Sequence, residues 1–197
     1  MEANVFYSFA PMRVLLIDNY DSFTFNLVHA LEPMVNELIV WRNDEFELSD
    51  VASFDKIIFS PGPSLPNEAG LMMQVIEKYH RKIPMFGVCL GFQAIVEFFN
   101  GELINIEPVR HGIQREIHVK SESLFRGLKP IQKVGLYHSW AVKTDQLPKV
   151  LSLLSWDSNN VVMAFEHEML NMVGVQFHPE SIMTPNGKEM LAKWISQ

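Results

Sequence analysis

Strand-like and helix-like segments alternate over the first half of this 197-residue chain, and this alternation restricts the fold more than any other feature. The strand-like runs are almost continuously apolar, as in strands that are buried on both faces. They are Arg13–Asp18, Glu37–Trp41, Lys56–Ser60 and the run that begins at Ile83–Phe86. Strands that alternate with helices predict an α/β fold: a mostly parallel central sheet flanked by helices, with ligands at the carboxyl ends of the strands.

Helical periodicity separates these strands. Ser22 is predicted to be the N-cap of the first helix. The side chains that this helix should direct to the core are Phe25, Leu27, Val28 and Leu31. Further helices are predicted over about Leu71–Arg81, directly after Cys89, and over about Gly187–Ile195.

After Gly101 the pattern changes to short strands with little helix between them. The candidates are Glu102–Ile106, Gln114–Val119, Lys133–Tyr137, Val150–Ser155, Val161–His167 and Met172–Phe177. They predict an antiparallel extension of the sheet, with a small second sheet as an alternative. No linker divides the chain, so we expect a single domain over residues 1–197, with residues 1–12 as an N-terminal extension.

Composition narrows the class of protein. The charged residues sum to 16 minus 23, or −7, with no basic block, which argues against a nucleic-acid or anionic-membrane partner. No apolar run approaches the ~20 residues that span a bilayer. The first residues lack the basic region of a signal peptide, and one cysteine cannot form an internal disulfide. We therefore expect a cytoplasmic protein.

That cysteine, Cys89, lies in the sequence Gly87-Val88-Cys89-Leu90-Gly91, between an apolar strand and a helical pattern. This is the thiol version of the nucleophile elbow, in which flanking glycines permit a sharp, strained turn. The positive end of the following helix favours the thiolate. Taken alone, a buried structural cysteine is the competing interpretation.

A nucleophilic thiol needs a base and a group that orients the base. His178 and Glu180 are the best candidates, because residues two apart on an extended backbone at a strand end point to the same face. The competing interpretation is a His-Glu pair without a role. Other histidines fall in predicted helices (His29, His80), in predicted strands (His118, His167) or in loop-like stretches that could line a site (His111, His138). No cluster has metal-ligand spacing, so we expect no metal or other cofactor.

The loop Pro61-Gly62-Pro63 follows the third predicted strand, next to the elbow in a parallel order. Gly62 can present its backbone N–H to the site, and the amide of Leu90 is a natural second donor. Two converging N–H groups form an oxyanion hole. An isolated Pro-Gly-Pro, by contrast, is more often only a turn.

Together these segments resemble the class I (triad) glutamine amidotransferases, which have a flavodoxin-like fold. The branch they resemble most is the glutaminase subunit of anthranilate synthase and aminodeoxychorismate synthase. Four blocks, in the family order, carry the resemblance, which covers the chain from about Met12 to Gln197. They are Asp18-Asn19-Tyr20-Asp21-Ser22-Phe23-Thr24, Ser60-Pro61-Gly62-Pro63, Gly87-Val88-Cys89-Leu90-Gly91-Phe92-Gln93 and Gln176-Phe177-His178-Pro179-Glu180-Ser181.

The resemblance implies that Cys89 is the nucleophile, His178 its base and Glu180 the orienting partner. It also implies that the amides of Gly62 and Leu90 form the oxyanion hole. Substrate glutamine would be held by Gln93 and by the backbone of Ser139 and Trp140. The ammonia released would pass to a separate synthase subunit that adds it to chorismate, and any Mg²⁺ would belong to that partner.

Four positions depart from the family pattern. Ile113 stands where a lysine is usual, Ser64 where a glycine is common, Phe92 in place of a more polar residue, and Trp140 in place of leucine. None removes a catalytic atom, and the change at Ile113 bears most on contact with a partner.

Three alternatives remain open from the sequence. The partner could be the aminodeoxychorismate (folate) synthase rather than the anthranilate (tryptophan) synthase. The chain could instead be a free-standing γ-glutamyl hydrolase on the same fold, or a non-enzymatic subunit with an idle site.

Overall fold

A computed structural model describes residues 12–197, so the predicted extension lies, apart from Met12, outside the described residues. The described residues form one nine-stranded sheet of order β2-β1-β3-β4-β9-β8-β7-β5-β6. Its strands are β1 Arg13–Asp18, β2 Glu37–Arg42, β3 Lys56–Phe59, β4 Met85–Val88, β5 Ile104–Val119, β6 Ile131–Ala141, β7 Leu151–Trp156, β8 Val162–His167 and β9 Met172–Val175. The α-helices are α1 Thr24–Leu31, α2 Met72–Tyr79, α3 Leu90–Phe98 and α4 Gly187–Ile195. Short 3₁₀ helices cover Glu32–Met34, Asp50–Ser53, Pro66–Glu68, Ser123–Phe125 and Thr144–Gln146.

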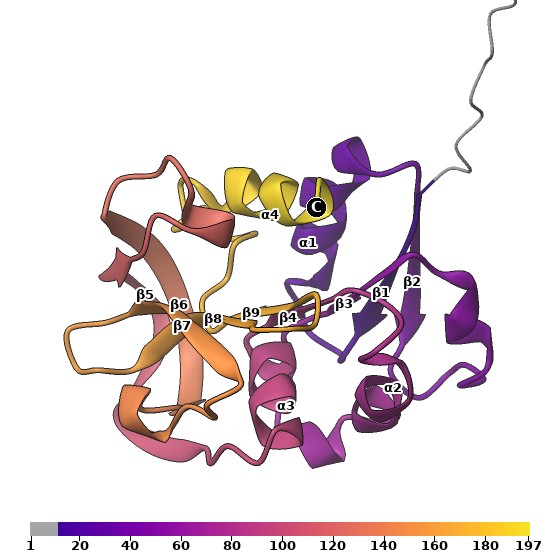
Figure 1. Cartoon of the computed structure of the whole chain (residues 1–197), viewed down its shortest axis with the longest axis horizontal. Helices are drawn as coiled ribbons and strands as arrows, with labels where there is room; N and C mark the ends of the chain where they lie inside the picture. Colours follow the sequence, from indigo (N-terminus) through magenta and orange to yellow (C-terminus); the bar gives the residue numbers. More distant parts are fainter. Residues whose placement is uncertain (1–11) are drawn as a thin grey trace, which may run out of the picture.

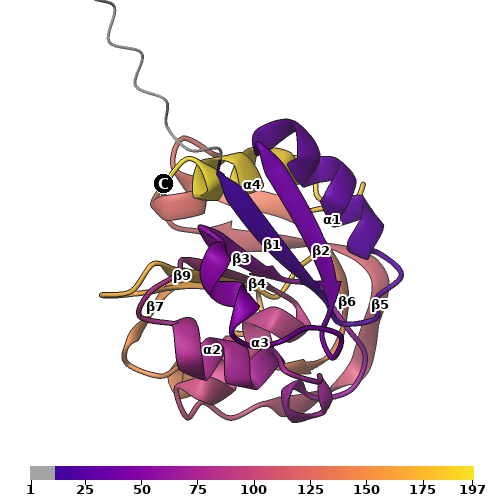
Figure 2. The ribbon, with the colours of Figure 1, turned by 90° about the vertical axis from the view of Figure 1, so that its right-hand side faces the viewer.

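Parallel pairing joins β2, β1, β3 and β4, as the strand–helix alternation predicts. The sequence placed β9 in the antiparallel extension, but this strand also pairs in parallel with β4. Helices α1 and α4 cover one face of this sheet, and α2 and α3 cover the other (Figures 1 and 2). Successive residues of β1 therefore face different cores: Val14 and Leu16 pack on the α1–α4 side, and Leu15 and Ile17 on the α2–α3 side. This double coverage explains the continuous apolar run in β1. The predicted α/β class is confirmed.

Antiparallel pairing extends the sheet from β9 through β8 and β7 to β5 and β6. The two strands predicted at Glu102–Ile106 and Gln114–Val119 are parts of the single strand β5, whose register shifts at two points. The alternative of a second sheet is wrong, because β5 pairs with β7 at His118 and Val119. Beyond those two residues β5 leaves β7 and continues with β6 as a long ribbon (Figure 2).

Two expectations for α1 are wrong. The helix begins at Thr24 rather than after Ser22, and its N-cap residue Phe23 makes no side-chain cap. Two carboxylates instead stabilise the turn that precedes the helix: Asp21 accepts the Phe23 N–H at 2.7 Å, and Asp18 accepts the Thr24 hydroxyl at 2.7 Å. In the resulting register Phe25 faces solvent and is 60% exposed.

No helix in residues 12–197 combines the length and apolar character needed to cross a membrane.

Candidate active site

Cys89 lies at the turn between β4 and α3. Its backbone angles, φ 51° and ψ −97°, lie in a region that non-glycine residues rarely adopt. The turn brings the backbone of Gly91 so close to Gly87 that a Cβ on Gly87 would lie 2.4 Å from the Gly91 carbonyl carbon. The two glycines therefore permit the turn, and Cys89 is the N-cap residue of α3, at the positive end of the helix dipole.

His178 and Glu180 meet in the segment that follows β9. The Nδ1–H of His178 donates to Glu180 Oε1 at 2.6 Å, and the two side chains are 3% and 0% exposed. The geometric reason inferred from the sequence is wrong, since this segment is not an extended strand end. His178 forms an isolated bridge to Gly135 of β6, and Glu180 follows in a turn, which bends its carboxylate back to the ring.

Cys89 and Glu180 together control the protonation of His178. Burial alone would lower the pKa of this histidine, but hydrogen bonding to Cys89 and to Glu180, together with their negative charges, raises it to about 10. Because Nδ1 is committed to Glu180, Nε2 is the ring atom left for the sulfur. At neutral pH this arrangement favours the imidazolium form of His178.

The loop that contains Gly62 packs against Leu90, the residue of the other predicted oxyanion donor. A Cβ on Gly62 would lie 2.7 Å from a methyl carbon of Leu90, so the loop after β3 touches the first turn of α3. Within residues 12–197 neither amide N–H donates to a protein acceptor, which leaves both for a ligand. Asn19 supports the loop from β1 by donating its side-chain amide to the Ser60 carbonyl at 2.9 Å.

A chain of hydrogen bonds connects the predicted glutamine-binding residues to the sulfur. The side-chain amide of Gln93 donates to the Trp140 carbonyl at 3.1 Å and to Gln176 Oε1 at 3.2 Å. Gln176 in turn donates to Cys89 Sγ at 3.5 Å. Ser139 lies beside Trp140 on β6. The sequence places Gln176 in a motif but indicates no role for it.

Three other neighbours of His178 were also missed as site residues. Phe23 and Tyr137 set their rings edge-on to the imidazole, at centroid distances of 6.0 and 4.8 Å. Asp21 lies close enough to interact with the His178 and Glu180 charges, and burial raises its pKa. The motif that contains Asp21 and Phe23 thus forms one wall of the site.

Of the six other histidines, His138 lies next to the site, because it shares the Trp140 carbonyl with Gln93. It lies in β6 rather than in a loop, 3% exposed, and its Nδ1–H donates to the Trp140 carbonyl at 2.8 Å. Burial lowers its pKa to about 4. A histidine that stays neutral is not a charged partner for Cys89. His111 lies in β5, where its ring packs against Tyr137.

The four departures from the family pattern are accommodated. Ser64 has φ 67°, the left-handed conformation that explains why glycine is common there. Phe92 is fully buried and packs on Phe165 at 5.0 Å. Trp140 acts through its carbonyl, which any residue supplies.

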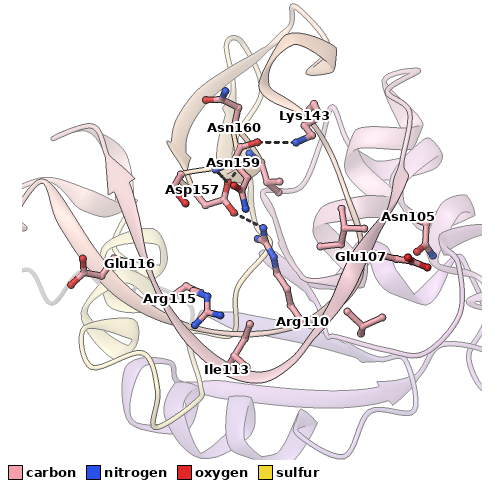
Figure 3. A pocket seen from close by; sticks show the side chains of 14 residues that line it. Asn105, Glu107, Arg110, Ile113, Arg115, Glu116, Lys143, Asp157, Asn159 and Asn160 are labelled. Atoms are coloured by element: carbon pink, nitrogen blue, oxygen red, sulfur yellow. Dashed lines mark hydrogen bonds and ion pairs between the residues drawn. The ribbon is translucent and has the colours of Figure 1, made fainter.

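Ile113, the fourth departure, lines a cavity of about 650 Å³ where β5 diverges from the β7–β8 turn (Figure 3). Arg110 crosses this space from β5 and pairs with Asp157 at 2.6 Å, while Lys143 donates to the Asn159 carbonyl at 2.8 Å. The cavity does not include the predicted catalytic residues. Its ion pair ties the β5–β6 ribbon to the rest of the sheet.

Within residues 12–197, no group of three or more histidine, cysteine or acidic side chains is arranged to hold a metal ion.

The sheet and the elbow define a class of α/β proteins with a cysteine at the turn between a central parallel strand and a helix. Comparison with known families identifies this class: the model of the family "Glutamine amidotransferase class-I" matches residues 15–197. The chain belongs to the class I glutamine amidotransferases, an enzyme family, which confirms the resemblance inferred from its motifs.

Similar proteins carry two kinds of name. The chain is 42% identical over 191 residues to anthranilate synthase component 2 of Pseudomonas aeruginosa, covering 93% of this chain and 95% of that protein. It is 42% identical over 184 residues to aminodeoxychorismate/anthranilate synthase component 2 of Bacillus subtilis, covering 92% and 95%. Identity to aminodeoxychorismate synthase component 2 of Escherichia coli is 40% over 184 residues, covering 92% and 98%.

A solved structure supports the fold. The crystal structure of a putative GMP synthase protein from Thermoplasma acidophilum superimposes with a TM-score of 0.85, covering 95% of this chain and 94% of that chain. At 22% identity this likeness concerns the fold alone.

Proposed function

We propose that this chain is the glutaminase subunit of a chorismate-using synthase. It hydrolyses L-glutamine to glutamate and ammonia, and it delivers the ammonia to a separate synthase subunit. The observation that carries this proposal is the buried Cys89–His178–Glu180 grouping at the elbow, with two unpaired amides beside it. The names of the relatives support a synthase partner.

Acylation begins from the Cys89 thiolate, with the proton on Nε2 of His178. The sulfur attacks the side-chain amide carbon of glutamine, and the carbonyl oxygen takes up negative charge between the N–H groups of Gly62 and Leu90. When the C–N bond breaks, His178 gives its proton to the departing nitrogen, which leaves as ammonia. Glu180 stabilises the imidazolium throughout.

Deacylation uses the same groups in reverse. Neutral His178 takes a proton from water, and the resulting hydroxide attacks the glutamyl thioester. The C–S bond breaks, glutamate leaves, and the thiolate–imidazolium pair is restored.

These steps use this chain's residues alone, and we assign the requirement for Mg²⁺ to the chorismate chemistry of the partner. The single cysteine suits the reducing cytoplasm, where we place the protein.

We favour the anthranilate synthase of tryptophan biosynthesis as the partner complex, with the aminodeoxychorismate synthase of folate biosynthesis as the alternative. Relatives of both names are about equally similar to this chain, at 40–42% identity. Assaying the purified chain with each synthase, glutamine and chorismate separates the two by the product formed.

Replacing Cys89 by alanine tests the division of labour. The complex should lose glutamine-dependent synthesis and retain ammonia-dependent synthesis, because the partner needs only ammonia. Product formation from each nitrogen source is the measurement. Loss of both activities would contradict the proposal, and hydrolysis of γ-glutamyl peptides without any partner would favour a free-standing hydrolase.

A further inference from the structure

Gln176 is a fully buried amide beside the nucleophile, and the proposed reaction leaves it without a role. It follows β9, which pairs with β4 so that Val175 lies opposite Val88. The Cys89 N–H donates to the Val175 carbonyl at 2.9 Å, which fixes the elbow against this segment. Gln176 therefore reaches the sulfur from the position directly after the strand that holds the elbow in place.

The hydrogen-bond chain determines which end of the Gln176 amide faces the sulfur. A backbone carbonyl can only accept, so the Trp140 oxygen requires an N–H from Gln93. The second N–H of the same nitrogen then donates to Gln176 Oε1. With its oxygen occupied, Gln176 can present only Nε2 to Cys89 Sγ, at 3.5 Å.

His138 fixes the Trp140 carbonyl, at which this series of hydrogen bonds begins. Its Nδ1–H donates to the same Trp140 carbonyl at 2.8 Å, so that oxygen is held by two donors. The amide orientation is thus imposed by a carbonyl on β6, at a distance from the sulfur.

We propose that Gln176 is a catalytic residue that donates a hydrogen bond to the Cys89 thiolate and acts alongside His178, the proton carrier. Donation to an ionised acceptor is stronger than donation to a neutral one, so this contact favours the thiolate over the thiol. It acts before attack on the amide, and again when the thiolate leaves the glutamyl thioester. This inference rests on the proposed function.

The rate of Cys89 alkylation by iodoacetamide, measured against pH, tests the donor directly. Cys89 is the chain's single cysteine, so the reaction reports on this sulfur alone. Gln176→Met keeps the volume and removes the donor. We expect alkylation at pH 7 to slow about tenfold, with the midpoint of the pH profile moved to higher pH.

Gln132→Met is the matched control. Gln132 is also buried, at 4% exposed, and makes two hydrogen bonds, to the Lys129 carbonyl at 2.8 Å and from Asn186 at 2.7 Å. This variant should alkylate at the wild-type rate. Gln93→Met, which frees the Gln176 amide to rotate, should slow alkylation as well, and the double variant should be no slower than Gln176→Met. A Gln176→Met profile equal to that of wild type would overturn the proposal.

A measurement on the unaltered chain covers the case in which Gln176→Met does not fold. The side-chain amide NMR signals of Gln176 should shift when Cys89 is alkylated, whereas those of Gln132 should not. Unmoved Gln176 signals would overturn the proposal. Neither readout needs glutamine turnover: a wild-type chain that releases no ammonia from glutamine in the presence of either synthase would refute the proposed function and leave the donor assignment standing.

Discussion

At the scale of single residues, the side chains of the candidate site fix one another's position and protonation state. Glu180 accepts from His178 at 2.6 Å, and the pKa of His178 is raised to about 10 although burial opposes the charge. Glu180→Gln keeps the size and an acceptor oxygen but removes the charge that stabilises the imidazolium. We expect it to lower glutamine-dependent turnover about 10²-fold, and His178→Ala about 10⁴-fold because the proton carrier is lost. Turnover of the complex with glutamine is the measurement, with ammonia-dependent synthesis as its control; equal or reversed losses would mean that the roles are wrongly assigned.

Some residues of the site could be predicted from the sequence and others could not. Cys89, His178 and Glu180 stand out because their types and local spacing indicate nucleophilic chemistry. Gln176 does not, since its sulfur partner is 87 positions away and the contact exists only because β9 lies beside β4. Phe23 was hidden for the same reason.

At the scale of elements, the parallel half was predictable because each strand carries its own signal. β1 and α4 begin and end where the sequence indicates. The antiparallel half was less predictable from the sequence. The irregular register of β5 interrupts the alternation of apolar and polar residues, and this one strand was therefore predicted as two. His111 and His138 looked like loop residues because they lie at or beside those irregularities.

One contact between two elements should contribute measurably to the free energy of unfolding. Lys56, at the start of β3, donates to the Trp194 and Ile195 carbonyls at 3.0 and 2.9 Å, near the end of α4, and burial lowers its pKa. Lys56→Met leaves both carbonyls without this donor, and we expect it to lower the free energy of unfolding by about 2 kcal/mol. Urea unfolding measures the loss, and hydrogen exchange should locate it in α4. Lys78→Met, at an exposed position on α2, should stay within about 0.5 kcal/mol of wild type. An equal effect of both changes would show that the hydrogen bonds of Lys56 to the end of α4 do not stabilise the fold.

At the scale of the whole molecule, the two halves of the sheet meet at the site. The parallel half supplies Cys89, whereas the β5–β6 ribbon supplies Trp140 and holds His178 through the bridge to Gly135. The ribbon joins β7 over only two residue pairs, and the buried Arg110–Asp157 ion pair adds a second attachment. The geometry of the site therefore depends on the ribbon staying closed on the sheet.

Acid should loosen this closure through His138, which faces the charges of Arg110, His178 and Asp157. Burial lowers its folded-state pKa to about 4, against 6.5 in the unfolded chain, so between these values only the unfolded chain binds the proton. Its contribution to stability is present above pH 6.5 and is lost as the pH falls to about 4, by about 3 kcal/mol in total. His138→Asn retains an N–H for the Trp140 carbonyl but does not titrate, so its deficit relative to wild type should shrink by that amount between pH 7 and pH 4. Urea unfolding at a series of pH values measures the gap, and the exposed variant His29→Asn should run parallel to wild type. Parallel curves for His138→Asn as well would show that this histidine does not carry the acid sensitivity of the fold.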